Sequence, residues 1–104
     1  MIEKVYTIDE IRQAVAPIAA RYGVDRVFLF GSYARGNANG SSDIDFAIEK
    51  GKIHGLQFAG MLGDLLEVFN KKVDLLTVSC IRENIENTGF CDRFERDKVV
   101  VYEQ

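Results

Sequence analysis

Short apolar runs rich in Val, Ile and Phe alternate with longer segments whose apolar residues recur every three or four positions. This alternation limits the possible folds most strongly, because the short runs are typical of buried strands and the longer segments of amphipathic helices. In chain order we expect a helix at Ile8–Tyr22, strands at Val27–Phe30 and Ile44–Ile48, a helix at Leu56–Phe69, a strand at Val73–Val78, a helical segment at Ile81–Arg96 broken near Gly89, and a strand at Val99–Tyr102. The order predicts an α+β (or α/β) fold with a small mixed sheet flanked by helices.

Local signals mark the ends of the two long helices. Thr7 and Glu10 have the spacing of a capping box at the start of the first helix, and Gly23 is typical of its end. Pro17 removes one backbone donor inside that helix, so we expect a kink or a bent last turn. Lys71–Lys72 follow the second helix, where positive charge is favoured, although contact of these lysines with phosphate is the alternative.

Length and composition exclude several classes of protein. A chain of 104 residues, 47% of them hydrophobic, can bury one core, so residues 1–104 are expected to form one domain. The net charge of −3 argues against a nucleic-acid-binding surface. No segment has the length needed to span a bilayer, and a cytoplasmic location is expected. Cys80 and Cys91 do not have the spacing of a zinc site and are expected to be reduced, structural thiols.

Three aspartates are associated with the predicted strands. Asp43 and Asp45 lie two positions apart and project to the same side of a strand, and Asp74 joins them if its strand is adjacent. Carboxylates about 4 Å apart repel by about 4 kcal/mol at an effective dielectric of 20, so a proton or a cation must compensate. Oxygen ligands without a nearby His or Cys suit Mg²⁺ or Mn²⁺ better than zinc.

A candidate phosphate site follows the first strand. Gly31 permits close approach of the backbone to a phosphate group, and the Ser32 hydroxyl and nearby amides can donate hydrogen bonds to it. Arg35, one helical turn later, adds a planar charged donor. A turn-rich connection leads from there to the paired aspartates, with one helical turn expected at Ser32–Arg35. Each motif alone is also typical of solvated strand ends or caps. Their joint order favours chemistry with a phosphate and a divalent cation.

The pattern Gly31-Ser32, ten residues, Asp43-Ile44-Asp45 resembles the signature of the DNA polymerase β-like nucleotidyltransferase superfamily, and GSYARG with SSDIDF is similar to its minimal nucleotidyltransferase (MNT) branch. The resemblance covers nearly the whole chain, and only Ile81–Lys98 departs from it. It implies a polymerase β-like fold that binds a nucleoside triphosphate with two divalent ions. It further implies that Asp43, Asp45 and Asp74 hold the metals, that Asp74 helps deprotonate the acceptor, and that Gly31, Ser32, Arg35 and Ser42 hold the triphosphate.

Proteins of this size in that branch are similar to the antitoxins of HEPN/MNT toxin–antitoxin pairs, some of which transfer AMP to a tyrosine of a HEPN partner. The resemblance therefore implies a nucleotidyltransferase of the EC 2.7.7 class that transfers a nucleotide, AMP from ATP, to a hydroxyl of a HEPN-type partner. One alternative is a non-catalytic antitoxin that acts by contact, and another is a nucleotide-sensing module. A homo-oligomer and a hetero-oligomer are both open.

The aromatic residues are interpreted mainly as core. Phe28, Phe30, Phe58 and Phe69 have the spacing of core positions rather than of base-stacking residues. Tyr33, directly after Ser32, has two open interpretations: it packs on the turn, or it faces the nucleotide.

Overall fold

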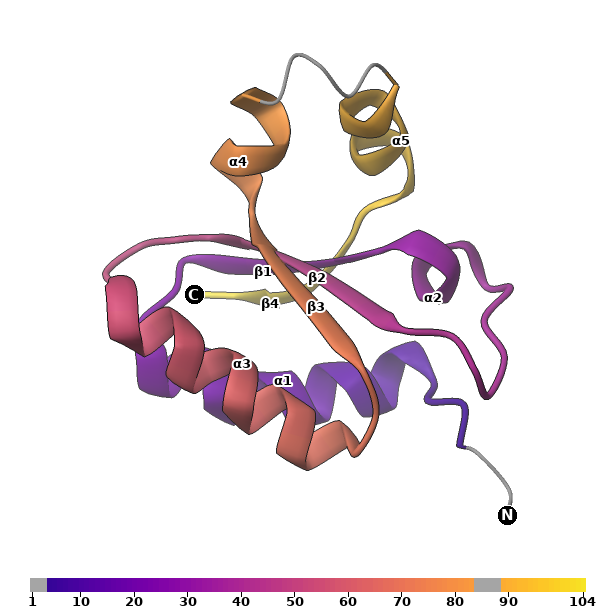
Figure 1. Cartoon of the computed structure of the whole chain (residues 1–104), viewed down its shortest axis with the longest axis horizontal. Coiled ribbons are helices and arrows are strands. Elements are labelled where there is room, and N and C mark those ends of the chain that lie inside the picture. The colour runs from indigo at the N-terminus through magenta and orange to yellow at the C-terminus, as the bar shows by residue number, and fades with distance from the viewer. Residues whose placement is uncertain (1–3, 84–88) are drawn as a thin grey trace.

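The computed structural model describes residues 4–83 and 89–104, and Figure 1 shows how their helices and strands are arranged. In chain order these are α1 (Ile8–Tyr22), β1 (Arg26–Phe30), α2 (Gly31–Arg35), β2 (Ile44–Glu49), α3 (Gly55–Phe69), β3 (Val73–Thr77), α4 (Val78–Glu83), α5 (Phe90–Asp97) and β4 (Val99–Glu103). The predicted elements are confirmed with small shifts of their ends. The main shift is at Val78, which begins α4 instead of ending β3.

The expected break in the last helical segment also occurs. Gly89 is the N-cap of α5 and has a left-handed backbone with φ of 90°, a conformation that glycine adopts at little cost. Residues between Glu83 and Gly89 lie outside the described ranges. Within the described ranges, this part of the chain contains two short helices, α4 and α5.

The four strands form one mixed sheet in the order β3-β2-β1-β4. Strand β1 pairs antiparallel with β2 and with β4, whereas β2 and β3 run parallel. A parallel pair needs a crossover connection, which α3 provides. The predicted mixed sheet flanked by helices is confirmed, and the crossover places the start of β3 beside the start of β2.

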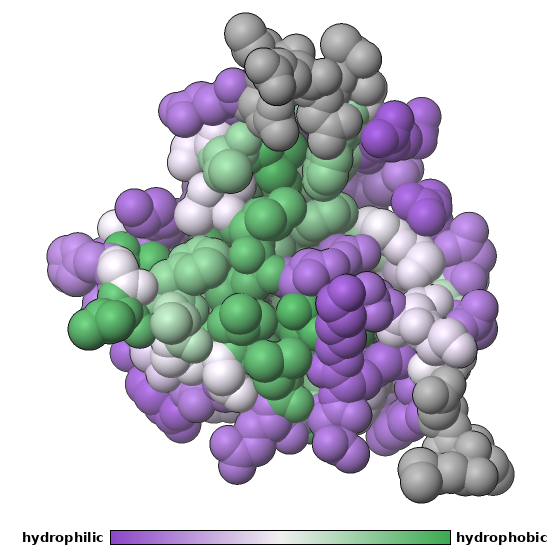
Figure 2. Space-filling view, in the orientation of Figure 1, coloured by the Kyte–Doolittle hydropathy of each residue, from purple (hydrophilic) through white to green (hydrophobic). Residues whose placement is uncertain are grey.

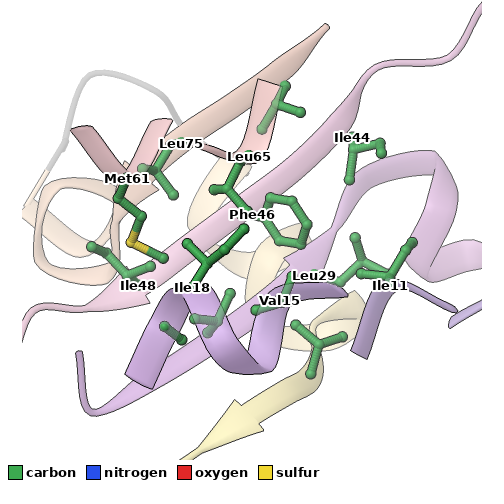
Figure 3. Packing of buried hydrophobic residues seen from close by; sticks show 14 of the residues in the cluster. Ile11, Val15, Ile18, Leu29, Ile44, Phe46, Ile48, Met61, Leu65 and Leu75 are labelled. Carbon is green, nitrogen blue, oxygen red and sulfur yellow. The ribbon is translucent and has the colours of Figure 1, made fainter. Parts of the chain in front are cut away.

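Helices α1 and α3 cover one face of the sheet and form the larger core with it (Figures 1 and 3). Ile11 and Val15 of α1 meet Phe46 of β2 and Met61 and Leu65 of α3 there, and all five are fully buried. Burying a side chain of this size contributes about 1.5–3 kcal/mol, so this layer holds the strands in register.

Helices α4 and α5 lie over the opposite face of the sheet (Figure 1). The smaller cluster there consists of Phe28, Phe30, Ala47, Val78, Ile81 and Phe94. Phe94 packs edge-to-face on both phenylalanines of β1, with ring centroids 5.9 and 5.4 Å apart. The interpretation of Phe28 and Phe30 as core residues is confirmed, as it is for the buried Phe69.

Helix α1 has the predicted ends. The Glu10 amide donates to the Thr7 hydroxyl at 3.1 Å and the Thr7 amide donates to the Glu10 carboxylate at 2.9 Å, which is the predicted capping box. Gly23 closes the helix with φ of 70°. Pro17 lies on an exposed side of the continuous helix, so water can hydrate the backbone carbonyl that receives no hydrogen bond from the proline. The expected kink stays a prediction.

Helix α3 ends differently from the expectation. Asn70 is its left-handed cap, with φ of 52°, and neither Lys71 nor Lys72 lies in its last turn. The Lys71 ammonium instead donates to the Tyr33 hydroxyl at 2.9 Å and to the Gly40 carbonyl at 3.3 Å. The predicted helix-end role of these lysines is therefore wrong, because their side chains extend toward the connection between β1 and β2.

Two remaining expectations concern cysteines and membranes. Cys80 is exposed and Cys91 is half-buried, and both are free thiols, as predicted. In the described part of the chain, no helix combines the length and the apolar character required to cross a membrane.

Candidate active site

The sheet register brings two of the predicted aspartates together. Asp45 of β2 lies directly beside Asp74 of β3 in the parallel pair. Their sequence neighbours Ile44 and Phe46 point into the core under α1 and α3 and are fully buried. Because side chains alternate along a strand, Asp45 and Asp74 project from the opposite face. The expectation that Asp74 lies on an adjacent strand is confirmed.

Asp45 is the most perturbed carboxyl group of the site. Its pKa is raised from the ordinary value of 3.8 to about 7, and burial is the largest cause. A hydrogen bond with Asp74 and the negative charges of Asp74 and Asp43 also raise this pKa, whereas the positive charge of Arg35 lowers it. A protonated Asp45 can donate to the Asp74 carboxylate. Without a cation, a proton thus relieves the repulsion between the two carboxylates.

Asp43 completes the acidic group just before β2. Its side chain is 39% exposed, and the Lys72 ammonium lies 3.6 Å from its Oδ2. Its charge still contributes to the raised pKa of Asp45, so the two carboxylates act on the same space. An exposed ion pair of this kind contributes little to stability, and Asp43 remains able to turn toward a cation.

Gly31 separates the end of β1 from α2 and contacts the Asp45 side chain. It has φ of 73°, and a Cβ at this position would collide with Oδ2 of Asp45. A residue other than glycine would therefore be strained and would also displace the carboxylate. Ser32 follows directly and is half-buried, so the Gly-Ser pair lies next to the acidic group, as its predicted role requires.

Tyr33 packs on the turn, which settles its open interpretation. Its side chain is 4% exposed and belongs to the larger core. Its hydroxyl accepts from Lys71, whose ammonium also lies 5.2 Å from the ring centroid. Lys71 thereby ties α2 and the Gly40 carbonyl to the start of β3, a positioning role that the sequence alone did not reveal.

Ser42 closes the turn that precedes Asp43. Its hydroxyl accepts from the Asn39 amide at 2.9 Å, and its own amide donates to the Asn39 carbonyl at 3.0 Å. A hydroxyl that accepts one hydrogen bond can still donate its own proton. Its predicted contact with the nucleotide therefore stays a prediction.

A small pocket of about 160 Å³ adjoins the acidic group, with Gly31 as a shared wall. It is lined by Phe30, Gly31, Arg35, Phe90, Arg93, Phe94 and Asp97. Arg35 lies 3.7 Å from the Asp97 carboxylate across this pocket. Sequence reasoning missed Arg93 and Asp97, although their spacing of four on a helical segment places them on one face and could have indicated a shared role.

The donor set fits a hard divalent cation. Across residues 4–83 and 89–104, no three His, Cys, Asp or Glu side chains are already arranged as a complete metal centre. The close pair Asp45–Asp74, with Asp43 nearby, nevertheless supplies only oxygen donors and carries the unfavourable charge that a cation would neutralise. Magnesium is typically held by one or two carboxylates and completed by water and phosphate oxygens, which this arrangement allows.

Taken together, the geometry provides carboxylates beside a Gly-Ser turn and two guanidinium groups. Carboxylates can bind a cation or accept a proton, and the guanidinium groups can bind phosphate oxygens in a bidentate manner. This combination is suited to transfer of a phosphoryl-containing group rather than to acyl transfer.

Comparison with known families agrees with this geometry. Residues 8–101 match the family described as the nucleotidyltransferase domain, and the chain belongs to that family. A Methanocaldococcus jannaschii protein that is provisionally named a protein adenylyltransferase is 40% identical over 75 residues, which cover 71% of this chain and 81% of that protein. Protein adenylyltransferase MntA of Thermococcus cleftensis is 31% identical over 87 residues, which cover 79% of this chain and 88% of that protein. The predicted enzyme class, a nucleotidyltransferase, is confirmed.

Solved structures show the same fold. A crystal structure of a toxin–antitoxin with AMP-PNP aligns over 89% of this chain and 73% of its own, with a TM-score of 0.68 and 19% identity. The structure of a tri-AMPylated Shewanella oneidensis HEPN toxin in complex with an MNT antitoxin aligns over 89% of this chain and 70% of its own, with a TM-score of 0.60 and 17% identity. The predicted nucleotidyltransferase fold is confirmed.

Proposed function

We propose that this chain transfers AMP from ATP to a hydroxyl of a HEPN-type protein and acts as the antitoxin of that pair. Two lines support the proposal: relatives that bear the name protein adenylyltransferase, and a structural neighbour described as an AMPylated HEPN toxin with its MNT antitoxin. The observation that carries it is the alignment of Asp45 with Asp74 beside Gly31, because paired carboxylates next to a Gly-Ser turn support a cation site beside a phosphate site.

The residues take the following roles in this proposal. Asp43, Asp45 and Asp74 would hold two divalent cations, Mg²⁺ or Mn²⁺, and these ions would supply neutralisation of the charge that develops during transfer. Ser32, the Gly31 amide and Arg35 bind the triphosphate, with the Ser42 hydroxyl as a further donor. The raised pKa of Asp45 reflects the same unfavourable negative charge that a bound cation would neutralise.

The proposed reaction is a displacement at the α-phosphorus of ATP. The acceptor oxygen forms a bond to this phosphorus, the bond to the oxygen that bridges to the β-phosphate breaks, and pyrophosphate leaves. The acceptor proton passes to Asp74, which is exposed and faces the same side as Asp45. Positioning and charge neutralisation supply most of the rate in such transfers.

A protein partner is in keeping with the apolar surface of this chain. Figure 2 shows hydrophobic side chains gathered over α4, β3 and α3, beside a more hydrophilic region. On α3, Leu56, Leu66 and Val68 are 92%, 40% and 46% exposed. Apolar side chains that gather on the surface are typical of protein–protein contact sites.

The test is incubation of the purified chain with α-labelled ATP, Mg²⁺ or Mn²⁺, and the product of the neighbouring gene. We expect label on the partner and release of pyrophosphate, and the sample without this chain serves as the control. A complex without label, combined with full neutralisation of the partner by Asp45→Asn, would instead establish an antitoxin that acts by contact. The absence of both label and complex would refute the proposal.

A further inference from the structure

The pocket between α2 and α5 contains two guanidinium groups, only one of which has an assigned role. Arg35 is the proposed triphosphate ligand, and Arg93 of α5 lines the same pocket. Within residues 4–83 and 89–104, Arg93 forms no ion pair, whereas its neighbour Arg96 binds Asp97 at 3.1 Å. Gly89 allows the Arg93 guanidinium to fold back, since a Cβ there would lie 3.0 Å from Nη1.

The aromatic walls of the pocket do not offer a stacking platform for a nucleobase. Phe30 and Phe94 are only 8% and 2% exposed, and their rings pack edge-to-face on each other at 5.4 Å. Phe90 packs on Phe30 at 5.9 Å. The rings thus contact one another and leave the polar groups at the mouth as the binding elements.

The volume of the pocket also favours a small group. Sites that enclose a whole drug-sized ligand measure about 300–1,000 Å³, and this pocket holds about 160 Å³. A single phosphate group fits such a space, and two planar guanidinium groups provide the forked donors that phosphate oxygens accept.

Asp97 is the one acidic residue among those that line the pocket. Its carboxylate accepts from Arg96 Nε at 3.1 Å, and the Arg35 guanidinium is more distant, at 3.7 Å. Arg96 comes first among the groups that lower its pKa, and Arg35 contributes less. Arg35 is therefore held only loosely by Asp97 and can turn toward an incoming phosphate.

We infer that Arg93 and Arg35 form a subsite for the terminal phosphate of the nucleoside triphosphate, and for the distal phosphate of the pyrophosphate product. Gly31 connects this subsite to the acidic group, so a triphosphate can extend from Asp45 into the pocket. The inference rests on the proposed function for the identity of the ligand. It adds Arg93, from the segment that departs from the family pattern, as a residue that recognises the triphosphate.

The test measures affinities of the full chain with Mg²⁺ for ATP, AMP and inorganic pyrophosphate by calorimetry, for wild type, Arg93→Ala and Arg93→Lys. We expect Arg93→Ala to weaken ATP and pyrophosphate about tenfold or more, as loss of a charged hydrogen bond does, and to change AMP less than twofold. Arg93→Lys keeps the positive charge but lacks the forked donors of the guanidinium group, so its affinities for ATP and pyrophosphate should lie between those of wild type and Arg93→Ala. Arg21→Ala, on the other face of the sheet and in an exposed ion pair with Asp64, is the matched control.

The possible outcomes separate this inference from the proposed function. Equal loss of ATP and AMP affinity would place the nucleoside in the pocket, and unchanged ATP and pyrophosphate affinity would remove Arg93 from the site; either result overturns the inference. If wild type neither binds ATP nor labels a partner, the proposed function fails, while an Arg93-dependent affinity for pyrophosphate alone would still support the subsite. Circular dichroism and thermal melting confirm that each variant is folded.

Discussion

The two faces of the sheet use the same strands for different purposes. On the face under α1 and α3, β2 contributes Ile44, Phe46 and Ile48, which are fully buried. On the face under α4 and α5, the alternate positions are Asp45, half-buried, and Ala47. Because neighbouring side chains of a strand point to opposite faces, a rigid core can fix the position of a charged group one residue away. The first face holds the fold, and the second presents the chemistry.

The largest effect expected from this comparison is on stability. Phe46→Ala removes a fully buried ring from the larger core and should lower the free energy of unfolding by about 3–5 kcal/mol. Phe90→Ala, which truncates a half-buried ring on the other face, should cost clearly less. Urea unfolding of both variants measures the difference. Equal losses of unfolding free energy in the two variants would show that both faces of the sheet contribute equally to stability, which would contradict the assignment of stability to the first face.

The next effect concerns activity instead of stability. Asp45→Asn should reduce AMP transfer by about 10²–10³-fold, the range for loss of one group that stabilises charge in the transition state. Its stability should be unchanged or higher, because the change relieves repulsion with Asp74. Asp64→Asn is the control, since Asp64 accepts from Arg21 and Tyr22 on the other face. Transfer of label from ATP to the partner protein measures the activity. Wild-type activity in Asp45→Asn would contradict the catalytic role assigned to Asp45.

A smaller effect is expected on pH dependence in the absence of divalent cations. The folded-state pKa of Asp45 is about 7, above its ordinary value of 3.8, so the folded state binds more protons than the unfolded state between these values. Stability from this group is therefore present below about pH 4 and is lost as the pH rises to about 7.

Urea unfolding in EDTA at pH 5 and at pH 8 measures this effect. Wild type should be more stable at pH 5 relative to pH 8 than Asp45→Asn, which cannot titrate. The same pH difference in both proteins would assign the effect to another group.

The smallest effect is expected at the lysines that follow α3. Lys71→Met removes the donor to the Tyr33 hydroxyl and the Gly40 carbonyl and should lower stability by about 1 kcal/mol. Lys72→Met removes an ion pair with Asp43 whose lysine is 70% exposed, and should cost less than about 0.5 kcal/mol. Thermal melting of both variants distinguishes them; equal shifts would mean that Lys71 does not hold the turn.

The sequence was sufficient for the features that depend on local pattern. The capping box at Thr7 and the short strands follow from spacing alone, whereas the common face of Asp43 and Asp45 stays a prediction because β2 begins only at Ile44. The adjacency of Asp74 depended on strand order, which the family resemblance supported and spacing did not. The site was therefore predictable where each side chain follows the period of its own element.

The remainder depended on contacts between distant parts of the chain. Lys71 and Tyr33 are 38 positions apart, and no periodicity links them. Arg93 and Asp97 lie in the segment that departs from the family pattern, so their approach to Arg35 required the position of α5 over the sheet. Such pairs depend on how elements pack, and a single sequence carries little information on them.

The short connection before β3 has a consequence for how this enzyme can change over evolution. Asn70, Lys71 and Lys72 separate α3 from β3, and this length sets which residue of β3 comes level with Asp45. Insertion or deletion of one residue there would bring Val73 or Leu75, respectively, to that level and turn Asp74 toward the core. The position of one carboxylate relative to the other is thus encoded in a connection that lies outside both strands, where a change in length would be as damaging as the loss of an aspartate.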